Sequence, residues 1–199
     1  MKKIFGFMML ALMCVVTMSA EEKTTINRMV LKAAQEFNAV VVSGDVTVEL
    51  RFNPEKAGYI VYHYDKRADK KIRCFNDGNV LHVQGSADAV MTRIVVFYGQ
   101  PLEQIINNGD ARLVSLRVRS NRDAFGIVVN GKGDVRLGRV KAKNVDVVIN
   151  GAGNVEMRKV AVEKLNAVVN GSGNFVLGQN PDNLNIVRNG SGNVEALNK

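Results

Sequence analysis

Two glutamates in the second half of the chain, Glu156 and Glu195, come closest to a catalytic pair by type and spacing. They hold equivalent places in a repeating segment, two repeats apart, and Asp134 belongs to the same side of that segment. If successive repeats stack about 4.8 Å apart, the two glutamate Cα atoms lie about 10 Å apart. This distance loosely fits the two carboxylates of an inverting polysaccharide hydrolase. No aromatic residue stands beside them to hold a sugar ring, so we predict solvated surface charges and no catalytic residue.

The other residue types that carry chemistry are few. His63 and His82 are the only histidines, which leaves little for a metal cluster or a catalytic triad. The stretch GKGDVR at residues 131–136 lacks the third glycine of a dinucleotide-binding fingerprint and lies in a strand repeat. We therefore predict no metal and no cofactor.

The N-terminus has the layout of a secretory signal peptide. Two lysines precede an uncharged stretch that runs to Ala20, and its apolar core, residues 4–16, is too short to span a bilayer comfortably. We place cleavage after Ser19 or Ala20, which gives an exported protein of the periplasm, the outer-membrane surface or the extracellular space. Cys14 raises a lipoprotein alternative, which is less favoured because Met13 stands where lipidation needs a small residue.

The mature chain, residues 21–199, is expected to be one domain. Removal of residues 1–20 takes the net charge from +8 to +6, because this segment holds two lysines and no acidic residue. Such a modest excess on an exported protein does not indicate nucleic acid, and no later segment is apolar enough to span a membrane. Cys74 is then the only cysteine, and it follows Ile72 by two residues in an alternating stretch. We predict a buried core thiol in preference to an intermolecular disulfide.

Nearly identical Asn-Gly steps set the second half of the chain in register. The motif reads NGKGD, NGAGN, NGSGN and NGSGN, at intervals of 20, 20 and 19 residues. The four copies begin at Asn130, Asn150, Asn170 and Asn189. Upstream, residues 102–125 look like a degraded copy of the same unit. A period of this length predicts a repeat architecture.

Two strand architectures fit this period. Asn-Gly between apolar runs is a strong hairpin signal, and four hairpins in a row would form an antiparallel meander. A parallel β-helix stacks equivalent residues of successive coils instead, which favours identical corner residues. Glycines such as Gly131 and Gly133 suit a corner that turns with positive φ. We therefore predict an all-β fold, with a single-stranded parallel β-helix of 20-residue coils in the C-terminal half.

Side-chain alternation predicts which columns of the stack face the core. We expect the asparagines to point inward as a structural ladder in which each amide donates to the next: Asn130, Asn150, Asn170 and Asn189. The apolar column two residues earlier is expected to point inward with them: Val128, Val148, Val168 and Val187. The residues between then point outward as an apolar contact stripe: Val129, Ile149 and Val169. Such a stripe should be covered, either by residues 24–50 or by a second copy in a homo-oligomer.

The first half of the mature chain is less regular but also strand-like. The strand candidates are residues 40–50, 58–65, 72–83 and 91–98. Within 72–83, Asp77-Gly78 marks the turn of a hairpin. Residues 24–37 could form a short amphipathic helix, but the many neighbouring strands make a helix the less favoured prediction.

The chain resembles the head GIN domain proteins, a family labelled putative auto-transporter adhesins. The resemblance is carried by FNAVVVSGDVTVEL at Phe37–Leu50, by the NDGNVLHV turn, and by the run of NGxGN coils. Together these motifs cover residues 37–196, most of the mature chain. The resemblance implies a right-handed, all-β parallel helix, and it brings no catalytic residues.

These observations favour a non-enzymatic function. We predict an exported cell-envelope protein, an adhesin or binding module that presents a stacked face to a glycan or protein ligand. Two alternatives remain open. One is a polysaccharide-active β-helix enzyme. The other is a structural envelope protein that assembles end to end through unpaired strand edges.

Overall fold

The described part of the chain is almost entirely β-strand. The computed structural model describes residues 27–32, 36–64, 72–85, 93–121 and 123–196. Within them, one short 3-10 turn at Pro54–Lys56 is the only helical segment. The all-β prediction is therefore confirmed, while the predicted signal peptide, residues 1–20, lies outside the described residues.

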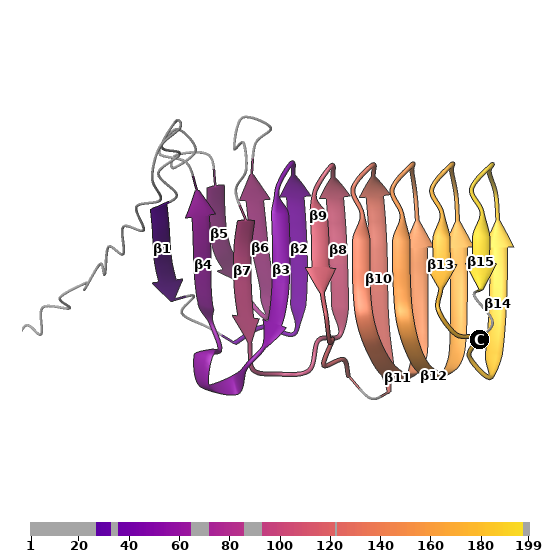
Figure 1. Cartoon of the computed structure of the whole chain (residues 1–199), viewed down its shortest axis with the longest axis horizontal. Helices are drawn as coiled ribbons and strands as arrows, with labels where there is room; N and C mark the ends of the chain where they lie inside the picture. Colours follow the sequence, from indigo (N-terminus) through magenta and orange to yellow (C-terminus); the bar gives the residue numbers. More distant parts are fainter. Residues whose placement is uncertain (1–26, 33–35, 65–71, 86–92, 122, 197–199) are drawn as a thin grey trace, which may run out of the picture.

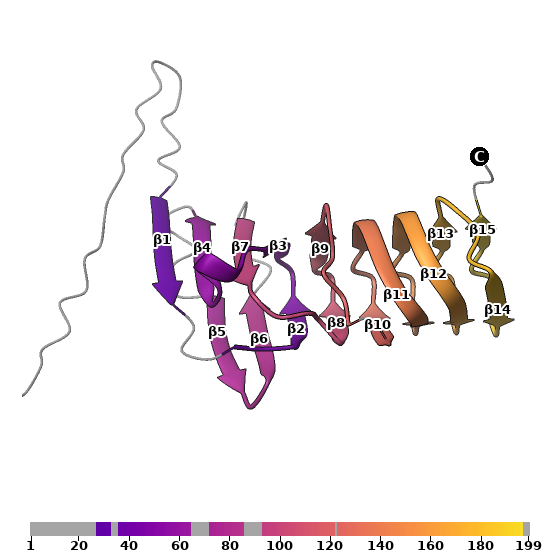
Figure 2. The same cartoon turned by 90° about the horizontal axis from the view of Figure 1, so that it is seen from below.

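The fifteen strands of the described part form one mixed sheet that folds into two facing layers (Figures 1 and 2). Layer one contains β1 (Asn27–Lys32), β4 (Tyr59–Tyr64), β7 (Arg93–Tyr98), β3 (Thr47–Phe52), β9 (Arg112–Ser115), β13 (Phe175–Leu177) and β15 (Val194–Ala196). Layer two contains β5 (Ile72–Asp77), β6 (Val80–Gly85), β2 (Ala39–Gly44), β8 (Gln104–Gly109), β10 (Ala124–Gly131) and β14 (Asn183–Arg188). The long strands β11 (Val135–Ile149) and β12 (Val155–Val169) begin in layer one, bend, and end in layer two.

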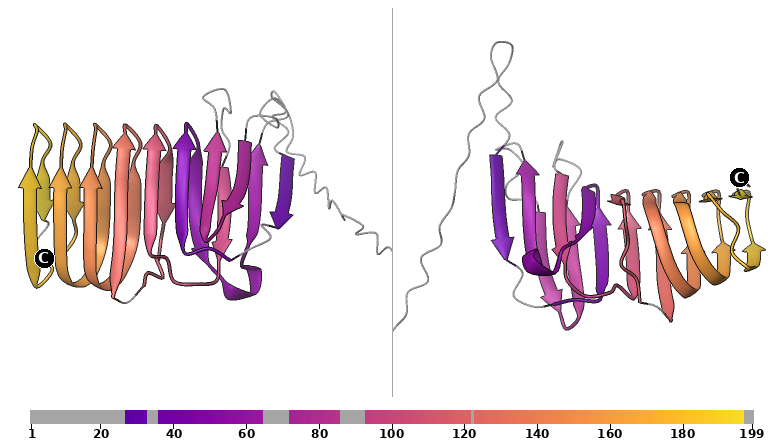
Figure 3. Two further views of the ribbon diagram at one scale, coloured as in Figure 1. Left: turned by 180° about the vertical axis from the view of Figure 1, so that it is seen from behind. Right: turned by 60° about the horizontal axis from the view of Figure 1, so that its bottom comes forward.

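The repeats pair in parallel, one period apart. Val148 of β11 lies opposite Val128 of β10 and Val168 of β12, so equivalent residues of consecutive repeats are neighbours. In layer one, Val135 lies opposite Val155 in the same way. Figure 3 shows the repeats standing side by side along one axis. The antiparallel meander is therefore wrong for the NGxGN segments.

The first half of the chain joins the same two layers. The corner at Gly44, where φ is 90°, connects β2 of layer two to β3 of layer one, and these strands pair in parallel with β8 and β9. The predicted hairpin is present, because β5 and β6 pair antiparallel around Gly78, where φ is 55°. Residues 27–32 form strand β1, antiparallel to β4, so the helix considered for this segment is wrong. The antiparallel strands make the sheet mixed.

The core lies between the layers, and on the strands that lead into the NGxGN corners it takes the opposite set of residues from the set that we expected. The columns that point inward in β10, β11 and β12 are fully buried: Ile127, Val129, Val147, Ile149, Ala167 and Val169. Val129 and Ile149 are 0% exposed and Val169 is 1% exposed, so the prediction that they form an outward contact stripe is wrong. The Val128 and Asn130 columns face solvent instead. Three successive apolar residues, Ile127 to Val129, satisfy either alternation, so hydrophobicity alone does not assign the sides.

Glycines at the corners allow the repeats to approach closely. A Cβ atom on Gly151 would lie 2.3 Å from the carbonyl oxygen of Gly131, and one on Gly171 would lie 2.3 Å from that of Gly151. The second glycine of the corner is equally tight, since a Cβ on Gly173 would lie 2.1 Å from the Gly153 oxygen. We expected these glycines to serve positive φ, but among them only Gly131 has it, at 150°. The common requirement is the absence of a side chain.

This close approach predicts that Gly171→Ala is strongly destabilising. The new methyl group would overlap a backbone carbonyl that no rotamer change can move, so the repeats must separate locally. We expect the free energy of unfolding to fall by about 1–3 kcal/mol or more, as for overpacked cores. Urea unfolding followed by circular dichroism measures the change. Ser172→Ala at the neighbouring exposed position is the control, and equal stability of the two variants would contradict the explanation.

Candidate binding face

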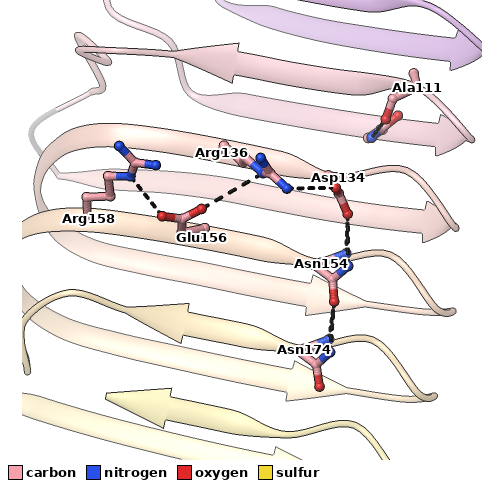
Figure 4. A network of polar contacts seen from close by, with 8 residues as sticks. Ala111, Asp134, Arg136, Asn154, Glu156, Arg158 and Asn174 are labelled. Carbon is pink, nitrogen blue, oxygen red and sulfur yellow. Dashed lines mark hydrogen bonds and ion pairs between the residues drawn. The ribbon is translucent and has the colours of Figure 1, made fainter. Parts of the chain in front are cut away.

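The carboxylates that resembled a catalytic pair belong to layer one, where Glu156 pairs with arginines and Glu195 bonds to an amide. Arg136 Nη2 lies 3.4 Å from Asp134 Oδ2, and its Nε lies 3.9 Å from Glu156 Oε2. Glu156 also accepts a hydrogen bond of 2.8 Å from Arg158 Nε (Figure 4). Glu195 is separated from Glu156 by Val176 and accepts from Asn193 Nδ2 at 2.8 Å. Asp134, Arg136, Glu156 and Arg158 thus form a chain of ion pairs, and Glu195 lies apart from it.

The same outward side of layer one continues as a charged surface toward the N-terminal half. Glu49 accepts a 2.6 Å hydrogen bond from Arg51 Nε and pairs with Arg93. Burial raises the pKa of the Glu49 carboxyl, but the hydrogen bonds and charges of the two arginines outweigh this effect and lower it below its usual value. Glu49 is buried between Arg51 and Arg93, and these two arginines are the exposed members of the pairs.

Layer two presents a different surface, an apolar stripe that crosses the whole stack. The apolar stripe consists of the outward residues that lie opposite one another on eight neighbouring strands: Phe75, His82, Val41, Ile106, Val128, Val148, Val168 and Val187. Phe75 and Val187, at its two ends, are 45% and 42% exposed, and the residues between them are partly exposed. Eight strands at about 4.8 Å spacing make the stripe about 34 Å long.

The outer side of this layer is free of other described elements. Residues 27–32 and 39–50, which we considered as a cover, belong to the two layers themselves. Figure 2 shows no described strand or turn beneath the row formed by β5, β6, β2, β8 and β10. An outward apolar stripe is therefore present, but on each strand it lies one residue before the position that we predicted.

One end of the stripe is aromatic. The rings of Phe75 and His82 stack with centroids 4.8 Å apart and an interplanar angle of 7°. The rings come from the two strands of the β5–β6 hairpin, where the two residues lie opposite each other. The hairpin thus adds a flat aromatic surface to the aliphatic part of the stripe.

The asparagine ladder borders the stripe on its corner side and lies on the surface. Asn130 donates to Asn108 at 2.9 Å, Asn150 to Asn130 at 2.9 Å, and Asn170 to Asn150 at 2.8 Å. Asn189 extends the row with a 2.8 Å bond to Asn170. The inward orientation that we expected is wrong. A side-chain amide can bond along the stack on either side of the sheet, and outside it avoids the cost of burying its remaining polar groups.

A second polar column borders the stripe on the opposite side. It contains Gln104, Gly126, Asp146, Asn166 and Asn185, each two residues before the stripe. Asn166 Nδ2 donates to Asp146 Oδ1 at 2.8 Å, so this flank also bonds along the stack. We did not predict this column, although Asp146 aligns with Asn166 in the repeat register of the sequence.

A further ladder follows the end of each corner, on the layer one side. Asn154 Nδ2 donates to Asp134 Oδ1 at 2.9 Å, and Asn174 Nδ2 donates to Asn154 Oδ1 at 3.0 Å (Figure 4). The Asn193 backbone N–H continues the row with a 3.0 Å bond to Asn174 Oδ1. Both asparagines of each NGxGN motif therefore hold neighbouring repeats together.

The bend opposite the corners contains a hollow of about 530 Å³. Val160 and Val162 of β12 line it, together with Lys141, Glu163 and Asp182. It lies where the third repeat is one residue short: Leu177 is 20 residues beyond its partner Met157, but Asn183 is 19 beyond its partner Lys164. Residues 178–182 absorb this difference. The mixed charges of the lining do not define a ligand chemistry.

The remaining reactive residues are not assembled into a site. Among the described side chains, no group of three or more His, Cys, Asp and Glu residues could hold a metal ion. Cys74 is half-buried against the core, and burial raises the pKa of its thiol to about 11, although a hydrogen bond with Tyr62 acts to lower it. The side chain of His63 lies outside the described residues.

The fold and this face define a β-repeat protein with a charged side and an apolar, amide-flanked side. The family model described as "Putative auto-transporter adhesin, head GIN domain" matches residues 36–198. The chain belongs to the head GIN domain family, as its motifs indicated.

Solved structures share the fold. A putative adhesin from Bacteroides fragilis is 13% identical with a TM-score of 0.59, and the match covers 89% of this chain and 100% of that one. A putative lipid binding protein from Parabacteroides distasonis is 11% identical with a TM-score of 0.55, over 87% and 98% of the two chains. No curated protein sequence matches the chain significantly. Within the described part of the chain, no helix has the length and apolar character needed to cross a membrane.

The raised pKa of Cys74 predicts that its thiol reacts slowly. Because thiolate is the reactive form and each pKa unit is tenfold, the native thiol at pH 8 should react about 100-fold more slowly than an unperturbed one. A Cys14→Ser chain leaves Cys74 as the only thiol, and its reaction with an aromatic disulfide reagent can be timed by absorbance. The urea-unfolded chain is the reference. Equal rates in the native and unfolded chains would contradict the burial argument.

The ladder predicts a measurable contribution of Asn150 to stability. Asn150→Ala removes one bond to Asn130 and one from Asn170, so we expect the free energy of unfolding to fall by about 1 kcal/mol. Lys132→Ala, at an exposed position of the neighbouring corner, should change it by less than about 0.5 kcal/mol. Chemical unfolding of both variants tests this. A loss no larger than that of the lysine variant would show that the exposed amide bonds are energetically neutral.

Proposed function

We propose that this protein is an exported, non-enzymatic adhesion or binding module that engages its partner through the outward surface of layer two. The observation that supports this most directly is the apolar stripe between two polar columns. Its length over eight strands and its position between two polar columns, rather than its area, are what suggest a binding role. Membership of an adhesin-like family and the signal-peptide layout of residues 1–20 agree with a place in the cell envelope.

We further propose that residues 21–199 form one domain whose C-terminal half is a right-handed, single-stranded parallel β-helix. The parallel registers of 19 or 20 residues in both layers support this, since each repeat then makes one full turn through a corner and a bend. The right hand is the hand that parallel crossover connections nearly always take.

The same geometry argues against the enzyme alternative. Glu156 lies between Arg136 and Arg158, and Asp134 pairs with Arg136 and the Asn154 amide. Carboxylates that are engaged by neighbouring arginines and amides are poorly placed to exchange a proton with a substrate. These contacts suit a role in holding the repeats together.

The first test is access on intact cells of the native host. We expect antibodies to label the protein at the surface and added protease to remove it, with a periplasmic protein protected in the same sample. Protection of both proteins would overturn the adhesion proposal.

The second test assigns the binding to layer two. Val148→Arg places a charge in the stripe, and Val176→Arg makes the same change at an outward position of layer one, between Glu156 and Glu195. We expect cells carrying Val148→Arg to adhere at least fivefold less well to their substratum, and cells carrying Val176→Arg to adhere normally. Equal adhesion of the two variants would place the binding surface elsewhere.

A further inference from the structure

We propose that the ligand of layer two is a linear neutral polysaccharide lying lengthwise along the apolar stripe. This inference rests on the proposed binding function of that face and names the chemistry of its partner. It follows from the width of the stripe, from the hydrogen-bonding groups that border it, and from the distribution of charge.

The stripe is long but too narrow to bury a second copy of the chain. It is one outward residue wide, which is about 7 Å on a strand, so with its length of about 34 Å it covers about 240 Å². A stable protein interface buries about 800 Å² on each partner, with an apolar centre. The polar columns on both sides would have to fill the rest of such an interface. A narrow, elongated ligand fits these proportions better.

The asparagine ladder keeps hydrogen-bonding capacity for such a ligand. A side-chain amide has two N–H groups and an oxygen with two lone pairs. In Asn130, Asn150 and Asn170, the ladder uses one N–H and one lone pair. Each rung therefore retains one donor and one acceptor on an exposed side chain. Hydroxyl groups, which donate and accept together, match this pair of functions.

A sugar chain meets the apolar and polar columns at the same time. A pyranose ring has C–H groups on its faces and hydroxyl groups around its rim. With a face on Val128, Val148 and Val168, its rim reaches the asparagine ladder on one side and the Asp146–Asn166 column on the other. The asparagines repeat at about 4.8 Å along the stack, so a polymer of similar sugar units can make the same contacts with each successive strand. The stacked rings of Phe75 and His82 offer one further sugar-stacking position at the end of the stripe.

The charge distribution favours a neutral polymer over an anionic one. From β8 to β14, the stripe and its two polar columns contain one charged residue among the described positions, Asp146. Basic residues of the repeats gather at the bend instead, where Lys141 and Lys143 of β11 lie beside the hollow. Nucleic acids, acidic glycans and anionic membranes are bound chiefly through Lys and Arg. The stripe and its two polar columns hold none of these residues from β8 to β14, although Lys164 stands two residues before Asn166 on the same layer.

The test is direct binding of defined polymers to the immobilised full chain, measured by biolayer interferometry in 150 mM salt. The neutral probes are mixed-linkage β-glucan, glucomannan and dextran. Polygalacturonate and vesicles of phosphatidylcholine with phosphatidylglycerol represent an acidic glycan and an anionic membrane. We expect at least one neutral polysaccharide to bind. Binding of none of the three, or stronger binding of polygalacturonate or vesicles, would overturn the proposal.

Variants and ligand length locate the site. Val148→Arg and the double variant Asn150→Ala, Asn170→Ala should each weaken binding at least tenfold, whereas Val176→Arg on layer one should leave it unchanged. Thermal unfolding by circular dichroism confirms that each variant is folded. Affinity should rise with the length of purified oligosaccharides until they reach about 34 Å, the span of eight strands. Unchanged binding by folded Val148→Arg, or affinity independent of length, would contradict a lengthwise site.

The outcomes separate this inference from the proposed function. If neutral polysaccharides fail to bind while Val148→Arg still reduces cell adhesion, layer two binds a ligand of another chemistry and the polysaccharide assignment is wrong. If Val148→Arg leaves adhesion intact while it abolishes polysaccharide binding, the face binds sugar but is not the adhesive surface.

Discussion

The close contact between glycine corners sets the geometry of the whole stack. A Cβ at Gly151, Gly171 or Gly190 would overlap the carbonyl oxygen of the glycine one repeat earlier, at 2.2–2.3 Å. With no Cβ there, repeats approach to the spacing at which backbone hydrogen bonds form on both sides of the corner. The asparagines that flank these glycines are then also at bonding distance, and the apolar residues between the layers pack directly on their equivalents. Ladders, core and outer surfaces all follow from this contact.

Because equivalent residues of successive repeats lie side by side, the residue type of each outward column determines the chemistry of one surface. A residue type that recurs once per repeat becomes a line across several strands. In layer one the outward positions include charged residues that pair with one another, Arg136 with Glu156 and Arg51 with Glu49. In layer two the recurring types are valine and asparagine, which leave an apolar line beside polar groups. The two surfaces therefore differ in chemistry although one backbone path builds both.

The sequence predicted the period, the strand character and the amide-to-amide bonds, because each depends only on residues that recur at fixed spacing. It also predicted the turn at Asp77-Gly78. The sides of the sheet were assigned wrongly, because Ile127, Val128 and Val129 are all apolar and Asn130 can bond along the stack in either orientation. Which column is buried depends on the backbone geometry between the corner and the strand. The sequence does not give this geometry, which is known only from the assembled layers. The stacking of Phe75 on His82 could not be predicted for the same reason, because the two residues lie on different strands.

The segment at residues 178–182 shows how this architecture tolerates changes in length. One residue is missing there, yet Phe175 before the segment stays in register with Val155, and Leu184 after it stays in register with Leu165. Small insertions and deletions at the bend thus leave the outer face of layer two undisturbed, whereas the same change at a glycine corner would shift every later column. Whole repeats can be gained or lost as units, each changing the face by one strand. Evolution can therefore vary the length of this surface in discrete steps while its chemistry stays the same.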